Sequence, residues 1–350
     1  MKIVNLLLIA LVFVSSCKEE TEDVPVLAKD YGDGMYIVTD NGISFYDGEV
    51  VKNQIYKKVN GNAILNGKKI KFKGTKAYIV ADDIITANIN TFENKEIISG
   101  FVNPVDFDFI DFDRLFVVDK GDSKVKVVDL QTLDITSDIE TGDATHPTFI
   151  ISTWVRAIVL NGGAVADTLK DSTIVAIDYR DGVIPFANFL GSIEVGENPN
   201  SAIWDGNLRI LCKGIYDPNN PISNTESSFS NVDPWDMELN WNKPLSGIYN
   251  AANLIYSSYS TKLYFTAEGG VYWMGQSAAS TTQVFNLESD VLFKKTEWYV
   301  VNDTTNALSD MLYVNDAISS PNTVYKYNVA TSSFCDTIVV DGDINDINFY

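Results

Sequence analysis

The sequence predicts an all-β fold, a seven-bladed β-propeller built from four-stranded antiparallel blades. Three observations support this prediction: a repeated unit of short strands, a regular spacing of apolar anchors, and two chain ends that complement each other. The clearest copy of the unit spans residues 103–142. Its apolar segments are 105–109, 114–119, 124–129 and 134–141, separated by short polar turns. One such sheet has two apolar faces and cannot cover both, so neighbouring copies must pack together.

An aromatic or branched anchor recurs inside an apolar run in the predicted second strand of each unit. The spacings between successive anchors are 42, 38, 42, 52, 54 and 49 residues. A period of this length, built from strands alone, is typical of a propeller. The alternative, a β-sandwich with a long meander, seldom keeps one motif in register over so many copies. The anchors are Tyr36, Tyr78, Phe116, Ile158, Ile210, Tyr264 and Tyr313.

The two ends of the chain each provide half of a blade. Residues 344–350 have the pattern of an innermost strand with no second strand after it, and residues 35–38 form a second strand with no first strand before it. We therefore expect these segments to pair and close the ring, which leaves no open sheet edge there. Removing residues 344–350 should cost far more stability than trimming an ordinary tail.

Blades one and five are expected to have the following strand and loop boundaries. In the first blade, residues 42–47 are expected to be the third strand and residues 54–59 the fourth. In the fifth blade, the fourth strand is expected near residues 238–241. That blade also has two enlarged loops, at 213–225 and 242–252. The connectivity of a propeller brings both loops out on the same face.

The first residues predict an export signal and a lipid anchor. Lys2, an apolar run over 3–14 and a small-residue site before Cys17 indicate a signal peptide at 1–16. The ending resembles the lipobox of bacterial lipoproteins, which implies that Cys17 is acylated. The acidic stretch that follows resembles the export signal of lipoproteins of the Bacteroidota. Residues 17–32 would then be a tether and 33–350 the propeller, held at the outer membrane and facing the cell exterior.

Composition restricts the classes of partner. The chain has 26 basic and 47 acidic residues and a formal net charge of −21, which argues against nucleic acid and against adhesion to anionic lipid. No second apolar stretch is long enough to span a membrane, so the lipid would be the only membrane attachment. We expect Cys212 and Cys335 to be unbridged, buried apolar residues.

The sequence offers little for catalysis, and we predict no catalytic residue, no cofactor and no metal. The single histidine, His146, precedes a proline in a loop between blades. Residues 341–346 superficially resemble a calcium loop but lack the distal glutamate. A second acidic group lies on the polar side of an inner strand that should line the central channel, where carboxylates are either solvated or functional. Its members are Asp106, Asp108, Asp111 and Asp113.

The repeated pattern of an apolar strand, Asp or Asn, a turn, and a strand ending in Val-Asp or Ile-Asp occurs at 115–130 and 172–179. It resembles the YncE-like family of seven-bladed propellers. With the lipobox, the chain resembles the surface propeller lipoproteins of the Bacteroidota. This resemblance implies a partner among TonB-dependent outer-membrane transporters and capture of a small nutrient such as cobalamin. It transfers no site residue.

The leading functional hypothesis is a non-catalytic binding module whose loop-rich face holds a small nutrient or docks on a transporter. The first alternative is a scaffold subunit of an envelope secretion or motility complex. The second is a metal-dependent propeller hydrolase or lactonase with its metal in the central channel. The candidate ligand contacts on the loop-rich face are Asp40, Asn41, Asp83, Asn103, Lys120, His146, Asn161, Asn198, Tyr216, Trp241, Tyr249, Glu268 and Asp316.

Overall fold

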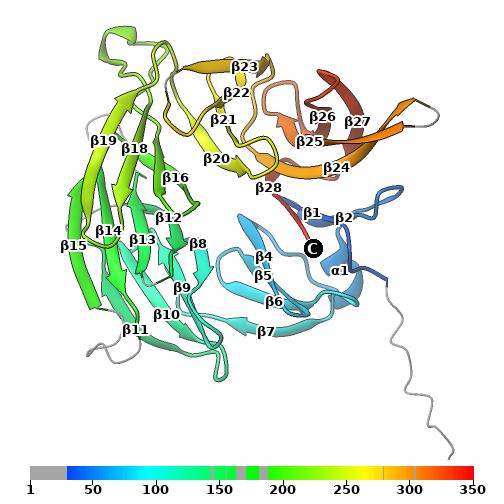
Figure 1. Cartoon of the computed structure of the whole chain (residues 1–350). Helices are drawn as coiled ribbons and strands as arrows, with labels where there is room; N and C mark the ends of the chain where they lie inside the picture. The colour runs from blue at the N-terminus through cyan, green and yellow to red at the C-terminus, as the bar shows by residue number, and fades with distance from the viewer. Residues whose placement is uncertain are drawn as a thin grey trace, which may run out of the picture.

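The protein is a ring of seven four-stranded antiparallel sheets, as the sequence predicts (Figure 1). The computed structural model describes residues 30–142, 146–154, 156–162, 171–180, 188–278, 280–302 and 305–350. Cys17, the signal peptide and most of the tether lie outside these residues.

The strands of the first three blades are given from the innermost to the outermost. Blade one consists of β28 (Ile344–Phe349), β1 (Met35–Thr39), β2 (Gly42–Tyr46) and β3 (Val51–Lys52). Blade two consists of β4 (Lys69–Lys73), β5 (Lys76–Val80), β6 (Ile84–Asn88) and β7 (Asn94–Ile98). Blade three consists of β8 (Pro104–Phe109), β9 (Arg114–Asp119), β10 (Lys124–Asp129) and β11 (Ile135–Glu140).

The other four blades follow in the same order. Blade four consists of β12 (Pro147–Ser152), β13 (Arg156–Asn161), β14 (Thr173–Asp178) and β15 (Asn188–Glu194). Blade five consists of β16 (Pro199–Trp204), β17 (Leu208–Cys212), β18 (Ser228–Asp233) and β19 (Glu238–Pro244), with a 3-10 turn at Pro221–Ser223. Blade six consists of β20 (Ala252–Ser257), β21 (Lys262–Ala267), β22 (Gly270–Met274) and β23 (Thr281–Phe285). Blade seven consists of β24 (Leu292–Asn302), β25 (Thr305–Asp316), β26 (Ser320–Asn328) and β27 (Ser333–Val339).

The core is divided among the gaps between neighbouring blades. Side chains alternate along a strand, so each second strand sends apolar groups to both of its neighbours. In β1, Met35 and Ile37 pack toward blade seven, whereas Tyr36 and Val38 pack toward blade two. The described residues form one apolar cluster at every such gap. Each blade therefore buries the apolar faces of its neighbours, which a single blade could not bury alone.

The predicted ring closure is confirmed. Strand β28 pairs antiparallel with β1, with Met35 opposite Phe349 and Tyr36 opposite Asn348. All seven predicted anchors lie in second strands, from Tyr36 in β1 to Tyr313 in β25.

One predicted strand is wrong. Residues 54–59 were expected to be the fourth strand of blade one, but that strand is the short β3, and Ile55–Asn60 form the helix α1. Gln54 takes a left-handed conformation with φ 51°, which ends the extended backbone. Ile55 and Tyr56 are then buried in the cluster between blades one and two. An outermost strand at this position would have left these two side chains exposed, whereas the helix buries them.

The prediction for the cysteines is half correct. Cys212 is fully buried in β17, and burial raises its thiol pKa to about 12. Cys335 is exposed because it lies on β27, the outermost strand of blade seven, which has no sheet beyond it. Both thiols are free.

Candidate functional site

The propeller has two faces, and the longer loops open on one of them. We call this the pocket face. It carries the loops between the second and third strands of each blade and the loops that connect one blade to the next. Of the thirteen candidate contacts, all but Trp241 lie in these loops or at the strand ends that they join.

Trp241 is not a loop residue. Strand β19 continues to Pro244, so the predicted end of the fourth strand in blade five was too early. The Trp241 ring packs against Phe229, with centroids 5.9 Å apart, and the ammonium group of Lys243 lies 4.5 Å from its centroid. This residue covers the outer part of the blade and takes no part in the pocket face.

Several candidates on the pocket face serve the loops themselves. The carboxylate of Asp40 accepts the N–H of Asp343, beside Asn41 in the ring-closing turn. The carboxylate of Asp316 accepts the N–H groups of Ile318 and Ser319. These bonds stabilise turns.

Four further candidates are engaged in the same way. Asp83 accepts the hydroxyl of Ser99, and Asn103 accepts the ammonium of Lys68 at 2.7 Å. Asn161 is fully buried at the end of β13, and the side chain of Asn198 donates to the carbonyl of Gly214. None of these four lines the recess described below.

Two more candidates, Lys120 and His146, also lie away from the recess described below. The backbone N–H of Lys120 donates to the carbonyl of Asn103, and burial lowers the pKa of the Lys120 ammonium. His146 is half-buried directly before β12. Neither residue lines the recess.

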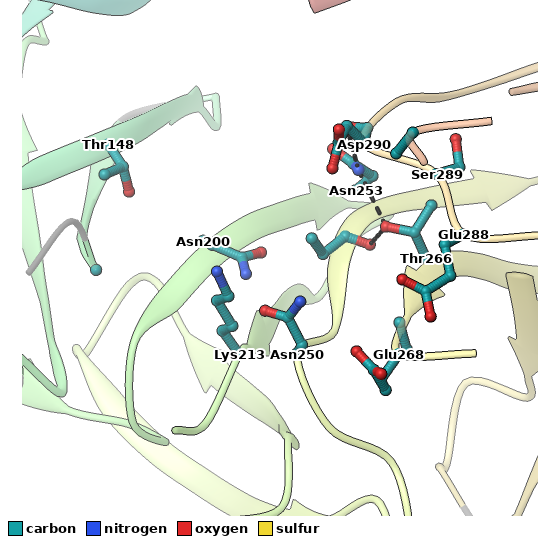
Figure 2. A pocket seen from close by; sticks show the side chains of 14 residues that line it. Thr148, Asn200, Lys213, Asn250, Asn253, Thr266, Glu268, Glu288, Ser289 and Asp290 are labelled. Atoms are coloured by element: carbon teal, nitrogen blue, oxygen red, sulfur yellow. Dashed lines mark hydrogen bonds between the residues drawn. The ribbon is translucent and has the colours of Figure 1, made fainter. Parts of the chain in front are cut away.

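The recess on the pocket face has a volume of about 320 Å³ and is formed by blades four to seven (Figure 2). Among the candidates, Glu268 lines it directly. Its lining residues are Thr148, Gly162, Asn200, Lys213, Asn250, Ala252, Asn253, Thr266, Ala267, Glu268, Glu288, Ser289, Asp290 and Ala317.

One side of the recess is acidic. Glu268 and Glu288 are both half-buried, and no ion pair to either is formed within the described part of the chain. The N–H of Gly269 donates to Glu288 at 3.3 Å. A hydrogen bond to Glu268 raises the pKa of the Tyr216 hydroxyl, and the charges of both glutamates add to this effect. Figure 2 shows both glutamates on the same side of the recess.

Two tyrosines predicted as contacts lie next to Glu268. The rings of Tyr216 and Tyr249 lie 6.1 Å apart, and the backbone N–H of Glu268 donates to the carbonyl of Tyr249 at 2.9 Å. Both come from the enlarged loops of blade five. The structure thus brings three predicted residues together where these loops meet blade six.

The other side of the recess presents an ammonium group and amides. Figure 2 shows Lys213 and Asn200 set apart from Glu268 and Glu288. The backbone of Lys213 is fixed, because its N–H donates to the carbonyl of Asn198 and its carbonyl accepts the hydroxyl of Ser227. The recess therefore has a positive side and a negative side, with amides between them.

The third acidic residue, Asp290, stands on the rim, where buried Asn315 positions it. The side-chain oxygen of Asn315 accepts the N–H of Asp290 at 3.0 Å and the hydroxyl of Ser289 at 2.8 Å. Its amide nitrogen has no hydrogen-bond partner within the described residues. Within the described residues, the amide nitrogen of Asn315 thus remains available to donate a hydrogen bond next to the lining residues Ser289 and Asp290.

Most of the lining was not predicted from the sequence, including Lys213, Asn200, Glu288 and Asp290. One signal could have found Lys213: it follows the end of the second strand in blade five, the position that Lys120 occupies in blade three and Glu268 in blade six. Nothing in the strand pattern marks the other three, because they stand just before or at the start of inner strands.

The central channel holds a separate charged network. Asp106 is fully buried, and its carboxylate lies 3.1 Å from the ammonium of Lys71 and 3.7 Å from that of Lys69. Burial alone would raise the pKa of Asp106, but the two lysines outweigh it and hold the pKa below its ordinary value. Asp108 accepts the N–H and hydroxyl of Ser152. These two channel carboxylates are thus bound by the protein's own groups.

The other two acidic residues of this predicted group are not on the inner strand. Asp111 and Asp113 lie in the turn after β8, and Asp111 forms an ion pair with Arg114. Among the described residues, no group of three or more His, Cys, Asp or Glu side chains is arranged to hold a metal. In the same part of the chain, no helix is long and apolar enough to cross a membrane.

Comparison with known proteins supports the fold alone. No protein-family model matches the chain, and no curated protein matches it. A quinonprotein alcohol dehydrogenase-like protein from Bacteroides thetaiotaomicron superposes with a TM-score of 0.64 at 15% identity, over 91% of this chain and 78% of that one. A putative 6-phosphogluconolactonase from Bacteroides uniformis gives 0.62 at 12% identity, over 91% and 99%. A protein from Lactobacillus plantarum gives 0.64 at 12% identity, over 91% and 99%. The class that these likenesses define is the β-propeller.

Proposed function

We propose that this propeller is a lipid-anchored binding module of the outer membrane, and that it captures a small nutrient in the recess of its pocket face. The observation that carries the proposal is the meeting of Lys213, Glu268 and Glu288 around one cavity on a rigid ring. Convergent polar groups in a concave site are typical of ligand binding, and loops on a rigid scaffold are where such sites form.

The lining favours a compact ligand that has both an ammonium group and a carboxylate. Its ammonium would meet Glu268 and Glu288, and its carboxylate would meet Lys213 and the amide of Asn200. Three carboxylates face one lysine around the cavity, so a basic amino acid or a short basic peptide suits it better than an acidic one. The volume is near the lower end of the range of about 300–1,000 Å³ for ligand sites. A cobalamin-sized molecule would enter it only in part.

Isothermal titration calorimetry tests this proposal. Arginine, leucine and glutamate would be compared with a cobalamin, haem and a siderophore. We expect arginine to bind most tightly and glutamate most weakly. Glu268→Gln should weaken arginine binding at least about tenfold, the effect of losing roughly 1.4 kcal/mol. Glu238→Gln, an equal charge change on the outermost strand β19, should have no effect. If none of these compounds binds, nutrient capture at this site is wrong.

The proposed partner is a TonB-dependent outer-membrane transporter, to which the module would deliver its ligand. Purification from intact cells under mild detergent tests this. Recovery of such a channel supports the proposal. Recovery of a secretion or motility apparatus without a channel would instead assign the scaffold role. Stoichiometric metal by elemental analysis, lost on Asp108→Ala, would assign the metal-dependent hydrolase.

A further inference from the structure

The exposed aromatic side chains are distributed unequally between the two faces. Among the residues that the structure describes, every exposed aromatic side chain that is not on an outermost strand lies on the face opposite the recess. We call this the aromatic face. Its turns and chain ends carry Phe112, Trp154, Trp235, Tyr259, Trp298 and Tyr350. The pocket-face loops expose aliphatic residues instead, namely Leu65, Val102, Ile222 and Ile318.

The most prominent element of the aromatic face is the β24–β25 hairpin. Figure 1 shows it reaching beyond its neighbours in blade seven. The third strand, β26, pairs with β25 only from Met311 onward, so the outer part of the hairpin has two strands alone. There Trp298 is 69% exposed and Val300 is 73% exposed, and Val301 is exposed as well. A run of exposed apolar residues on a projecting hairpin indicates a contact surface.

Two other aromatic residues are displayed on turns that are held in place. The ammonium of Lys73 donates to the carbonyls of Asp111 and Phe112, which fixes the turn that carries the 85% exposed Phe112. The hydroxyl of Tyr259 donates to the carbonyl of Leu308 and so joins the turn of blade six to the hairpin. A fixed turn loses little further entropy when its aromatic side chain meets a partner.

The described chain begins on this same face, next to the hairpin. Strand β1 enters the ring at Met35 from the aromatic face, and Gly34 exchanges backbone hydrogen bonds with Tyr350. Asp33 and Gly34 line one cavity with Lys295 and Glu297 of β24. From Cys17 to Asp30 the chain can span about 45 Å at most. A lipid on Cys17 would therefore hold Asp30, on this face, within about 45 Å of the membrane.

We propose that the aromatic face rests on the lipid surface in which the protein is anchored, with the β24–β25 hairpin as its principal contact. This inference rests on the lipid anchor of the proposed function. Trp and Tyr favour the membrane interface, because their rings are apolar at one end and polar at the other. The net charge of −21 favours a zwitterionic surface over an anionic one.

This orientation has a consequence for the recess. The pocket face lies on the opposite side of the ring, so a membrane beneath the aromatic face leaves Glu268 and Lys213 open to the surroundings. The anchor and the ligand site therefore do not compete for one surface.

Tryptophan quenching tests the inference on the full, lipidated protein. The protein would be reconstituted into phosphatidylcholine vesicles with brominated acyl chains, and its emission compared with that in unbrominated vesicles. We expect quenching in the native protein and a clear reduction in Trp298→Phe, with the remainder coming from Trp154 and Trp235 on the same face. Trp241→Phe, a matched change on the outermost strand of blade five, should retain it. Circular dichroism establishes that all three proteins are folded.

The outcomes separate this inference from the anchor on which it rests. If the protein floats with vesicles but Trp298→Phe is quenched as strongly as the native protein, the anchor stands and the membrane contact is wrong. If the protein carries no acyl group by mass spectrometry and does not float, both are wrong. A dimer in detergent that Trp298→Ser with Val300→Ser dissociates, without quenching, would assign the face to self-association and overturn the membrane contact.

Discussion

Gly34 and Tyr350 exchange backbone hydrogen bonds in both directions. The N–H of Tyr350 donates to the carbonyl of Gly34 at 3.1 Å, and the N–H of Gly34 donates to the carbonyl of Tyr350 at 3.4 Å. This exchange extends the β1–β28 ladder to the last residue of the chain. The C-terminal segment therefore supplies the innermost strand of blade one, and the ring is continuous only when both chain ends are in place.

Deletion of residues 344–350 should therefore prevent stable folding. It removes all of β28, exposes the edge of β1 and uncovers Met35 and Ile37, which pack toward blade seven. We expect a loss comparable with the whole stability of an ordinary domain, about 5–15 kcal/mol. Urea denaturation followed by circular dichroism measures it. Deletion of Tyr350 alone is the control and should leave a cooperative transition. A truncated protein with an unchanged midpoint would contradict the closure argument.

The buried carboxylate of Asp310 joins blades six and seven through four hydroxyl groups. Ser257 and Thr296 donate to one oxygen, and Ser260 and Tyr264 donate to the other. Asp310→Asn presents an amide nitrogen to two of these donors, so we expect a loss of roughly 3 kcal/mol, as for hydrogen bonds to a buried charge. Ser260→Ala removes one donor and should cost about 1 kcal/mol. Urea midpoints at unchanged m-value distinguish the two. Equal midpoints for Asp310→Asn and the native protein would refute the role of the charge.

Removing Lys71 should leave Asp106 as a poorly compensated buried charge. The Lys71 ammonium contacts the Asp106 carboxylate at 3.1 Å and also donates to the carbonyl of Phe107. We expect Lys71→Met to cost about 3–5 kcal/mol, as when one partner of a buried pair is removed. The double variant Lys71→Met with Asp106→Asn should be more stable than Lys71→Met alone, because residue 106 then carries no charge that lacks its closest partner. A double-mutant cycle in urea measures the difference, and strictly additive effects would contradict the coupling.

Asp346 should make stability fall as the pH rises from about 4 to 6. Burial in the channel raises its pKa from the usual value to about 6, although Lys69 and Lys71 partly oppose this. Between the unfolded and folded pKa values, the folded state holds a proton that the unfolded state has lost, so increasing pH favours unfolding. The contribution is fully present below about pH 4 and is lost by about pH 6, a change of roughly 1–3 kcal/mol.

The variant Asp346→Asn isolates that effect. It keeps an acceptor for the N–H of Ile70, which Asp346 binds at 3.0 Å, and it cannot titrate. Its stability relative to the native protein should rise between pH 4 and pH 6.5, as measured by urea denaturation at each pH. A constant difference across this interval would show that Asp346 titrates normally.

The candidate site could be predicted from the sequence only in part. Glu268, Tyr216 and Tyr249 were found because they stand in loops whose length and position the strand repeat defines. Glu288 and Asp290 were not, because nothing local distinguishes them from other polar residues before a strand. Their role comes from the approach of blade seven to blade six, which the spacing of anchors does not specify.

Three features of the fold follow from the chain alone, namely the number of blades, the second strand of each and the closure of the ring. They depend on the alternation of apolar residues and on a repeat that is visible along the chain. Three others appear only in the folded ring: residues 55–60 form a helix, Cys335 is exposed, and Lys213 faces two glutamates across a cavity. Alternation is a local property of the backbone, whereas burial and the pairing of charges depend on residues that the ring brings together from distant blades.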